Sequence, residues 1–232
     1  MSTTKEIYLI RHGETEWNTL KKIQGQEADI PLNDAGHKQA EKTGLYLMKY
    51  RLGSGRFDCM MSSPLLRAKE SAEIIKELVG FQGEIDYDDN LKEKKHGKLS
   101  GLTDKDDLMI KRKELKELLL LISDPIEKYN SFNFVDSMVN NKFDIGIEST
   151  EELETRIRPF IQKLIDSPCK KIIVVSHWGL LIELLGIMFH LTKVPKGNFD
   201  NGSNCWISYI TYDTVNGFQL ISYPNTEHLD LV

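Results

Sequence analysis

Apolar and polar residues alternate along the chain in two different rhythms. Short runs that are apolar on both faces occur at Glu6–Ile10, Phe57–Met61 and Lys171–Val175, and the last of these is β-branched and uninterrupted. Such runs are typical of strands that helices cover on both sides. Because helical patterns separate them, the pattern predicts an α/β fold with a mostly parallel central sheet.

Helical periodicity lies between and after these runs. Asn33 is a candidate N-cap for a helix that extends to about Lys49. Pro64 is expected to open a second helix, whose inner face carries Leu65, Ala68, Ala72, Ile75 and Val79. Two further helices are expected over Glu151–Asp166 and from about Leu180 to Phe189. Helices on both faces of the sheet make this a three-layer sandwich.

The last third of the chain predicts an antiparallel pair of strands. Cys205–Asp213 and Phe218–Tyr223 have strand character, and the turn between them carries Asn216-Gly217. An Asn-Gly turn between apolar runs is a strong hairpin signal. The hairpin is expected at the end of the otherwise parallel sheet.

The segment from Thr103 to Ile147 breaks this rhythm. A charged helix is expected over Lys105–Ile122, and an irregular aromatic stretch follows it. Insertions of this length inside a compact domain are rarely free loop. We therefore expect residues 103–147 to form a helical lid or subdomain within one domain of residues 1–232.

The composition is that of an ordinary globular protein. The chain has 232 residues, of which 40% are hydrophobic and 28% charged, and its formal net charge is −5. This acidic balance gives no reason to expect binding to nucleic acid or to an acidic membrane. No apolar run approaches the ~18 residues of a membrane span, and no signal-peptide core follows Met1–Lys5.

The cysteines indicate the redox state of the compartment. Cys59, Cys169 and Cys205 lie far apart in the sequence, and three cysteines cannot all pair. The sequence therefore argues against a disulfide scaffold and for a reducing, cytoplasmic location. Cys59 is expected to be buried in its strand.

Chemically active residues follow the two clearest parallel strands. The first strand continues directly into Arg11-His12-Gly13, and the strand at residues 171–175 continues into Ser176-His177. In open α/β sheets, ligands bind beyond the carboxyl ends of the strands. The third predicted parallel strand leads within a few residues to Arg67. Two histidines and two arginines are therefore expected at one edge of the sheet.

This set of side chains suits a phosphoryl group. Arginine offers a fixed fork of donors that matches phosphate oxygens, and it stays charged at neutral pH. Among such cations His12 is expected to remain neutral, which leaves a ring nitrogen able to attack phosphorus. The loop that follows offers small or amide groups to phosphate oxygens, at Thr15, Asn18, Gln24 and Gly25.

The segment Leu9-Ile-Arg-His-Gly-Glu-Thr-Glu-Trp-Asn18 resembles the signature of the histidine phosphatase superfamily, in its phosphoglycerate mutase-like branch. Four further segments resemble the family in the same order, and alone each would be weak. They are Ser63–Ala72, with Ser71 where threonine is usual, Leu91–Leu102, Gly146-Ile-Glu-Ser149 with one residue inserted, and Val175–Gly179. The resemblance implies a phosphoglycerate mutase-like fold.

The resemblance also implies roles for individual residues. His12 would be the nucleophile and form a phosphohistidine, and Glu93 would be the general acid and base. Arg11, Arg67 and His177 would bind the phosphoryl oxygens and stabilise the transition state. No metal or cofactor is expected, and the sequence shows no carboxylate cluster or His/Cys spacing typical of a metal site. For His96 a place in the pocket is left open, and His228 is expected in the C-terminal tail.

Two departures from the family pattern bear on specificity. Trp178 follows His177 where a small residue is usual, so we expect it to form a bulky wall of the substrate pocket. Leu181-Ile182 stand where the family often has an arginine. The stretch after Glu93 also lacks the tryptophan and paired arginines with which the mutases hold a substrate carboxylate.

These observations favour a phosphomonoester phosphatase acting on a small phosphorylated metabolite. One alternative is a 2,3-bisphosphoglycerate-dependent phosphoglycerate mutase, in which lysines of the insertion replace the missing arginines: Lys105, Lys111 and Lys113. The second alternative is a non-catalytic phospho-ligand binding module. The presence of both His12 and Glu93 ranks it lowest. A homodimer is left open.

Overall fold

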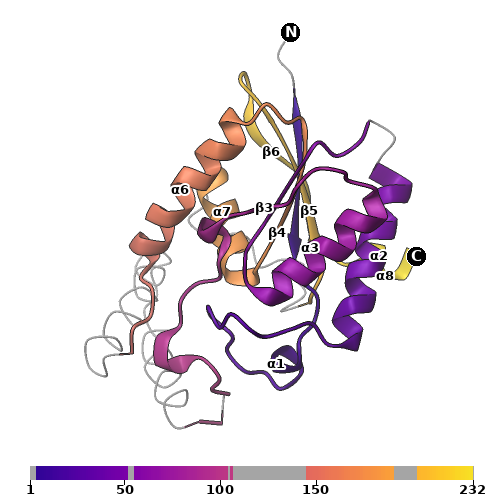
Figure 1. Cartoon of the computed structure of the whole chain (residues 1–232). Coiled ribbons are helices and arrows are strands. Elements are labelled where there is room, and N and C mark those ends of the chain that lie inside the picture. The colour runs from indigo at the N-terminus through magenta and orange to yellow at the C-terminus, as the bar shows by residue number, and fades with distance from the viewer. Residues whose placement is uncertain (1–3, 52–54, 104, 107–144, 191–202, 232) are drawn as a thin grey trace.

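The computed structural model describes residues 4–51, 55–103, 105–106, 145–190 and 203–231, and it contains a six-stranded mixed sheet (Figure 1). The strand order is β3-β2-β4-β1-β5-β6. The strands are β1 (Lys5–Arg11), β2 (Cys59–Ser62), β3 (Asp86–Tyr87), β4 (Lys171–Ser176), β5 (Ile207–Asp213) and β6 (Gly217–Asn225). β1 to β4 are parallel neighbours, whereas β5 and β6 form the antiparallel hairpin that the sequence predicts.

Helices cover both faces of the sheet, so the expected three-layer α/β architecture is confirmed (Figure 1). One face packs against α2 (Asp34–Arg51) and α3 (Leu66–Val79), and the other against α6 (Thr150–Asp166) and α7 (Trp178–Met188). The five apolar residues expected on the inner face of α3 are all buried. Among the described residues, no helix is long and apolar enough to cross a bilayer.

Short elements that the sequence pattern does not reveal complete the fold. They are α1 (Glu16–Thr19), the 3-10 turns η2 (Asp89–Leu91) and η3 (Gly97–Leu99), and α8 (His228–Leu231). α8 docks on α2, because Lys42 donates a hydrogen bond to the Leu229 carbonyl (2.7 Å) and His228 Nε2 lies 3.0 Å from the Thr43 hydroxyl. His228 is therefore a buried residue rather than part of a loose tail. Burial lowers its pKa to about 4.

The expectation about the cysteines is wrong for one pair. Cys59 at the start of β2 and Cys169 just before β4 form a disulfide across 110 residues of sequence, and Cys59 is only partly buried. β2 and β4 are parallel neighbours, so their starting points lie side by side although they are far apart in the chain. The argument for a reducing compartment rested on unpaired cysteines and no longer holds.

The predicted helical insertion cannot be compared with the structure over most of its length. The helix expected at Lys105–Ile122 and the aromatic stretch after it fall almost entirely on residues 107–144, which lie outside the described residues.

Candidate active site

The parallel register of the sheet places the two histidines side by side. β1 and β4 are neighbours, and Arg11 pairs with Ser176. The next residue on each strand is a histidine, and the two rings lie 5.1 Å apart between centroids. The backbone N–H of His12 also donates to the Ser176 carbonyl (2.9 Å). The histidines therefore meet at the carboxyl edge of the sheet, as their positions in the sequence predict.

The ring of His12 is held in its neutral form. Its Nδ1 lies 2.7 Å from the Gly13 carbonyl, which only accepts hydrogen bonds, so Nδ1 carries the proton. Burial, followed by the charges of Arg67 and Arg11, holds the pKa of His12 well below its usual range. The second ring nitrogen, Nε2, consequently keeps its lone pair.

Two buried arginines supply the positive charge. Arg11 ends β1 and donates to the Ser203 carbonyl (3.0 Å). Arg67, in the first turn of α3, donates to the carbonyls of Gly25 (2.8 Å) and Glu27 (2.9 Å). Burial lowers the pKa of each arginine to about 10, so both are charged at neutral pH. Arg67 therefore also fixes the loop that closes one side of the site.

His177 is held by a hydrogen bond to a serine that directly follows β2. Its Nε2 lies 2.7 Å from the Ser63 hydroxyl, and the ring is fully buried. Its Nδ1 is buried and has no hydrogen-bond partner among the described residues. Burial and then the charge of Arg67 hold the pKa of His177 well below its usual range. Nδ1 is thus the ring nitrogen that no described residue binds.

Glu93 lies at the N-terminus of α7. One carboxylate oxygen accepts the N–H groups of Lys94 (2.8 Å) and Leu180 (2.9 Å), and the other accepts that of Gly179 (3.1 Å). A Cβ at position 179 would come 2.7 Å from Glu93 Oε1, so a larger residue here would displace the Glu93 carboxylate. The first turn of α7 therefore positions the acid expected from the sequence, and α7 begins at Trp178, earlier than its apolar pattern predicts.

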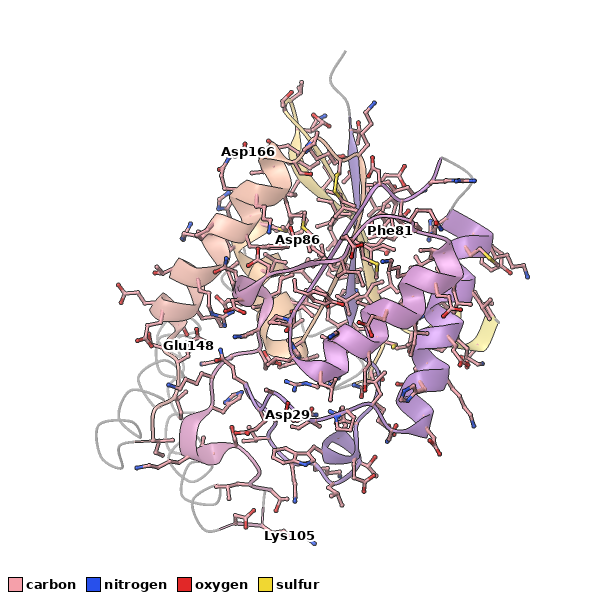
Figure 2. The ribbon with its side chains drawn as sticks, in the orientation of Figure 1. Asp29, Phe81, Asp86, Lys105, Glu148 and Asp166 are labelled. Carbon is pink, nitrogen blue, oxygen red and sulfur yellow. A yellow bond between two sulfur atoms is a disulfide. The ribbon has the colours of Figure 1, made fainter. Side chains whose placement is uncertain are left out.

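Arg156 on α6 holds the backbone of the Glu93 segment. It forms a two-pronged ion pair with Glu148 (2.8 and 2.9 Å), which Figure 2 shows near the N-terminal end of α6. Its guanidinium also donates to the carbonyls of Asn90 (2.8 Å), Lys92 (2.9 Å) and Glu93 (3.3 Å). No pattern in the sequence indicates this role for Arg156.

Asn204 holds the backbone of the loop after His12 in a similar way. Its side-chain nitrogen lies 3.1 Å from the carbonyls of both His12 and Gly13, and 3.2 Å from the Asn18 side-chain oxygen. Asn18 in turn shares a capping box with Thr15 at the start of α1. Thr15, expected to bind substrate, is thus placed as a helix cap and is fully buried.

The backbone of the loop after His12 lies in direct contact with the backbone of α2. A Cβ on Gly13 would lie 2.5 Å from the Gly36 carbonyl oxygen, and a Cβ on Gly36 would collide with the Glu14 carbonyl. The Gly13 N–H donates to the Ser71 hydroxyl (3.0 Å) on α3. Neither glycine leaves room for a side chain, so the loop is held directly against two helices.

A cavity of about 390 Å³ opens over these groups, a volume that suits a small ligand. Eight of the ten expected site residues line it: Arg11, His12, Asn18, Gln24, Gly25, Arg67, Glu93 and Trp178. Among the described lining residues Thr15 and His177 do not occur, whereas Lys22, Ile23 and His96 do. His96 was left open by the sequence, and Lys22 and Ile23 were missed although they lie inside the first loop.

No group of three or more histidine, cysteine or acidic side chains in the described part of the chain is arranged to hold a metal ion. The cavity is lined by the cationic side chains of Arg11, Arg67 and Lys22 and by the acidic side chain of Glu93.

Comparison with known families identifies the superfamily. The profile of the histidine phosphatase superfamily (branch 1) matches residues 7–225. The chain belongs to this superfamily. The resemblance seen in the first loop is therefore confirmed, and the relatives of this chain include proteins named as phosphatases and proteins named as phosphoglycerate mutases.

Three of these relatives illustrate the range. The chain is 32% identical over 180 residues to the protein named uncharacterized phosphatase PhoE of Bacillus subtilis, covering 77% of this chain and 75% of the relative. It is also 32% identical over 184 residues to phosphoglycerate mutase-like protein 4 of Arabidopsis thaliana, covering 77% and 69%. A phosphoglycerate mutase structure from Bacillus anthracis superposes with a TM-score of 0.76 at 22% identity, covering 99% of this chain and 96% of that one. The last likeness concerns the fold alone.

Proposed function

We propose that this superfamily member is a phosphomonoester phosphatase that works through a phosphohistidine on His12, with Glu93 as general acid and base. The observation that carries the proposal is the state of His12. Its ring is neutral, its Nδ1 proton is held by the Gly13 carbonyl, and its Nε2 is the nitrogen left for attack between two charged arginines.

In the first step, Arg11 and Arg67 bind the oxygens of the phosphoryl group. His177, in the neutral tautomer that carries its proton on Nδ1, donates a further hydrogen bond to these oxygens. The Nε2 lone pair of His12 attacks phosphorus, and the bond from phosphorus to the leaving oxygen breaks. Protonated Glu93 gives its proton to that oxygen. The products are the free alcohol, a phosphohistidine and the Glu93 carboxylate.

In the second step, water replaces the alcohol. The Glu93 carboxylate takes one proton from the water, the water oxygen attacks phosphorus, and the phosphorus–nitrogen bond breaks. Inorganic phosphate leaves, and both residues return to their starting protonation states. The arginines stabilise the charge on the phosphoryl oxygens in both steps.

A phosphate-release assay over a panel of phosphomonoesters tests this proposal. We expect hydrolysis of p-nitrophenyl phosphate that disappears in His12→Ala. Enzyme quenched in alkali during turnover, where phosphohistidine is stable, should carry phosphate on His12 by peptide mass spectrometry. Full activity in His12→Ala, or unlabelled His12 during turnover, would contradict the mechanism.

A phosphoglycerate mutase is the second candidate, favoured by Lys22 and His96, which line the cavity and could bind a carboxylate. Of the lysines expected to do so, Lys105 does not line the described cavity, and residues 111 and 113 lie outside the described residues. A mutase would need 2,3-bisphosphoglycerate to phosphorylate the enzyme. Incubation with 3-phosphoglycerate separates the candidates: isomerisation that depends on the bisphosphate indicates a mutase, and release of phosphate indicates a phosphatase.

A further inference from the structure

Trp178 lies beside the general acid at the rim of the cavity. It is the first residue of α7, lines the cavity, and is 40% exposed. The N–H groups of the two residues after it, Gly179 and Leu180, both donate to the Glu93 carboxylate. The indole therefore lies on the helical turn whose backbone binds the Glu93 carboxylate.

The position of the acid indicates where the leaving group must lie. The oxygen that leaves stands opposite the attacking nitrogen of His12, because phosphoryl transfer proceeds in line. It must also lie within hydrogen-bond reach of Glu93, which protonates it. The body of the leaving alcohol then extends from Glu93 along the wall that Trp178 forms.

Two other residues that line the cavity, Ile23 and Gln24, suit a ring. Ile23 adds apolar surface, and the side-chain oxygen of Gln24 is buried without a hydrogen-bond partner among the described residues. An acceptor of this kind pairs with a hydroxyl or a ring N–H of a ligand and repels a carboxylate. An indole face stacks with another flat ring.

We propose that Trp178 is a specificity-determining residue that stacks on an aromatic ring of the leaving alcohol. The substrate class is then the phosphate monoesters of alcohols that carry an aryl or heteroaryl group. This inference rests on the phosphatase proposed above, because it takes Glu93 as the mark of the leaving-group side.

Benzyl phosphate and cyclohexylmethyl phosphate form a matched pair of substrates. Their leaving alcohols have similar size and basicity, and only the first has an aromatic face. We expect the enzyme to prefer benzyl phosphate by about tenfold in kcat/KM, the effect of one good aromatic pair. The preference should persist in Trp178→Phe and fall to near unity in Trp178→Ala. Tyr223→Ala, which truncates an exposed aromatic on β6 outside the cavity lining, is the control and should keep it.

Binding to His12→Ala provides a second readout that needs no turnover. Benzylphosphonate should change the tryptophan fluorescence of His12→Ala, and the change should vanish when Trp178→Phe is added. Equal kcat/KM values for the two esters, or a preference that survives Trp178→Ala, would overturn the inference. If no ester is hydrolysed at all, the phosphatase proposal fails, and the phosphonate alone decides whether Trp178 binds aromatic rings.

Discussion

Replacing Arg156 with alanine should loosen the segment that carries the general acid. The substitution removes the arginine partner of Glu148, whose side chain is only 11% exposed, and removes the Arg156 donor from the carbonyls of Asn90 and Lys92. The Glu93 carbonyl also loses its bond to Arg156 but keeps the one from the Gln26 side chain (2.9 Å). Breaking a buried ion pair by removing one partner costs about 3–5 kcal/mol. Because Arg156 is itself 18% exposed, water will replace some of these bonds, and we expect the lower end of that range.

The catalytic consequence should depend on the leaving group. A displacement of the Glu93 segment by ~1 Å would slow the esters of poor leaving groups about 100-fold. Esters of p-nitrophenol, which need no protonation, should be slowed far less. Arg156→Lys keeps the charge but not the planar fork, so it should show a smaller loss of the same kind.

Arg158→Ala is the matched control, two residues further along the same helix. Arg158 is 63% exposed and, within the described part of the chain, forms an ion pair with Glu154 one turn earlier at 3.0 Å, so its removal should cost at most about 0.5 kcal/mol. Urea unfolding gives both stabilities, and kcat for the two classes of ester gives the catalytic effect. Equal destabilisation by the two substitutions would refute the reasoning about the ion pair. A loss of stability in Arg156→Ala with unchanged leaving-group dependence would show that Arg156 does not position the acid.

Three further outcomes are expected. Asn204→Ala should lower kcat about tenfold with little change in KM, because the Asn204 side chain holds the loop after His12 and does not line the described cavity. A change confined to KM would count against this role. His228 is neutral in the folded protein, whose pKa for this residue is about 4, and takes up a proton in the unfolded chain below pH ~6.5. The free energy of unfolding should therefore fall as the pH drops from ~6.5 to about 4, and in His228→Gln this pH dependence, measured by urea unfolding, should be shallower by up to ~1.4 kcal/mol per pH unit. Identical slopes for the two proteins would contradict the prediction. Reduction of the Cys59–Cys169 disulfide should lower the free energy of unfolding by about 2–4 kcal/mol. Dithiothreitol should therefore lower the Tm of the unaltered protein but not that of Cys59→Ser. A Tm that is insensitive to reductant in the unaltered protein would contradict the bond.

The sequence was sufficient to predict the central layers and the meeting of the two histidines. Long apolar strands and strongly periodic helices dominate their local segments, so their type follows from the pattern. Parallel strands then bring His12 and His177 to one edge without any further information. The first loop was specific enough to identify the family before any coordinate was known.

The supports of the site could not be predicted in this way. Arg156 binds backbone carbonyls, which every residue possesses, so its partners leave no trace in the sequence. Asn204 contacts the carbonyl of His12 from 192 residues away, beyond the reach of any local pattern. The start of α7 was misplaced because Glu93, far back in the chain, caps its first turn with a side chain that apolar periodicity does not register.

The contact between Gly13 and Gly36 has an evolutionary consequence. Each glycine faces backbone rather than a side chain, so no exchange of a neighbouring residue can make room for a Cβ at either position. A compensating change would have to move one of the two main chains, and His12 adjoins the first of them. Neither position can therefore drift by single substitutions, and mutational paths that exchange either glycine are closed as long as the two main chains keep this contact.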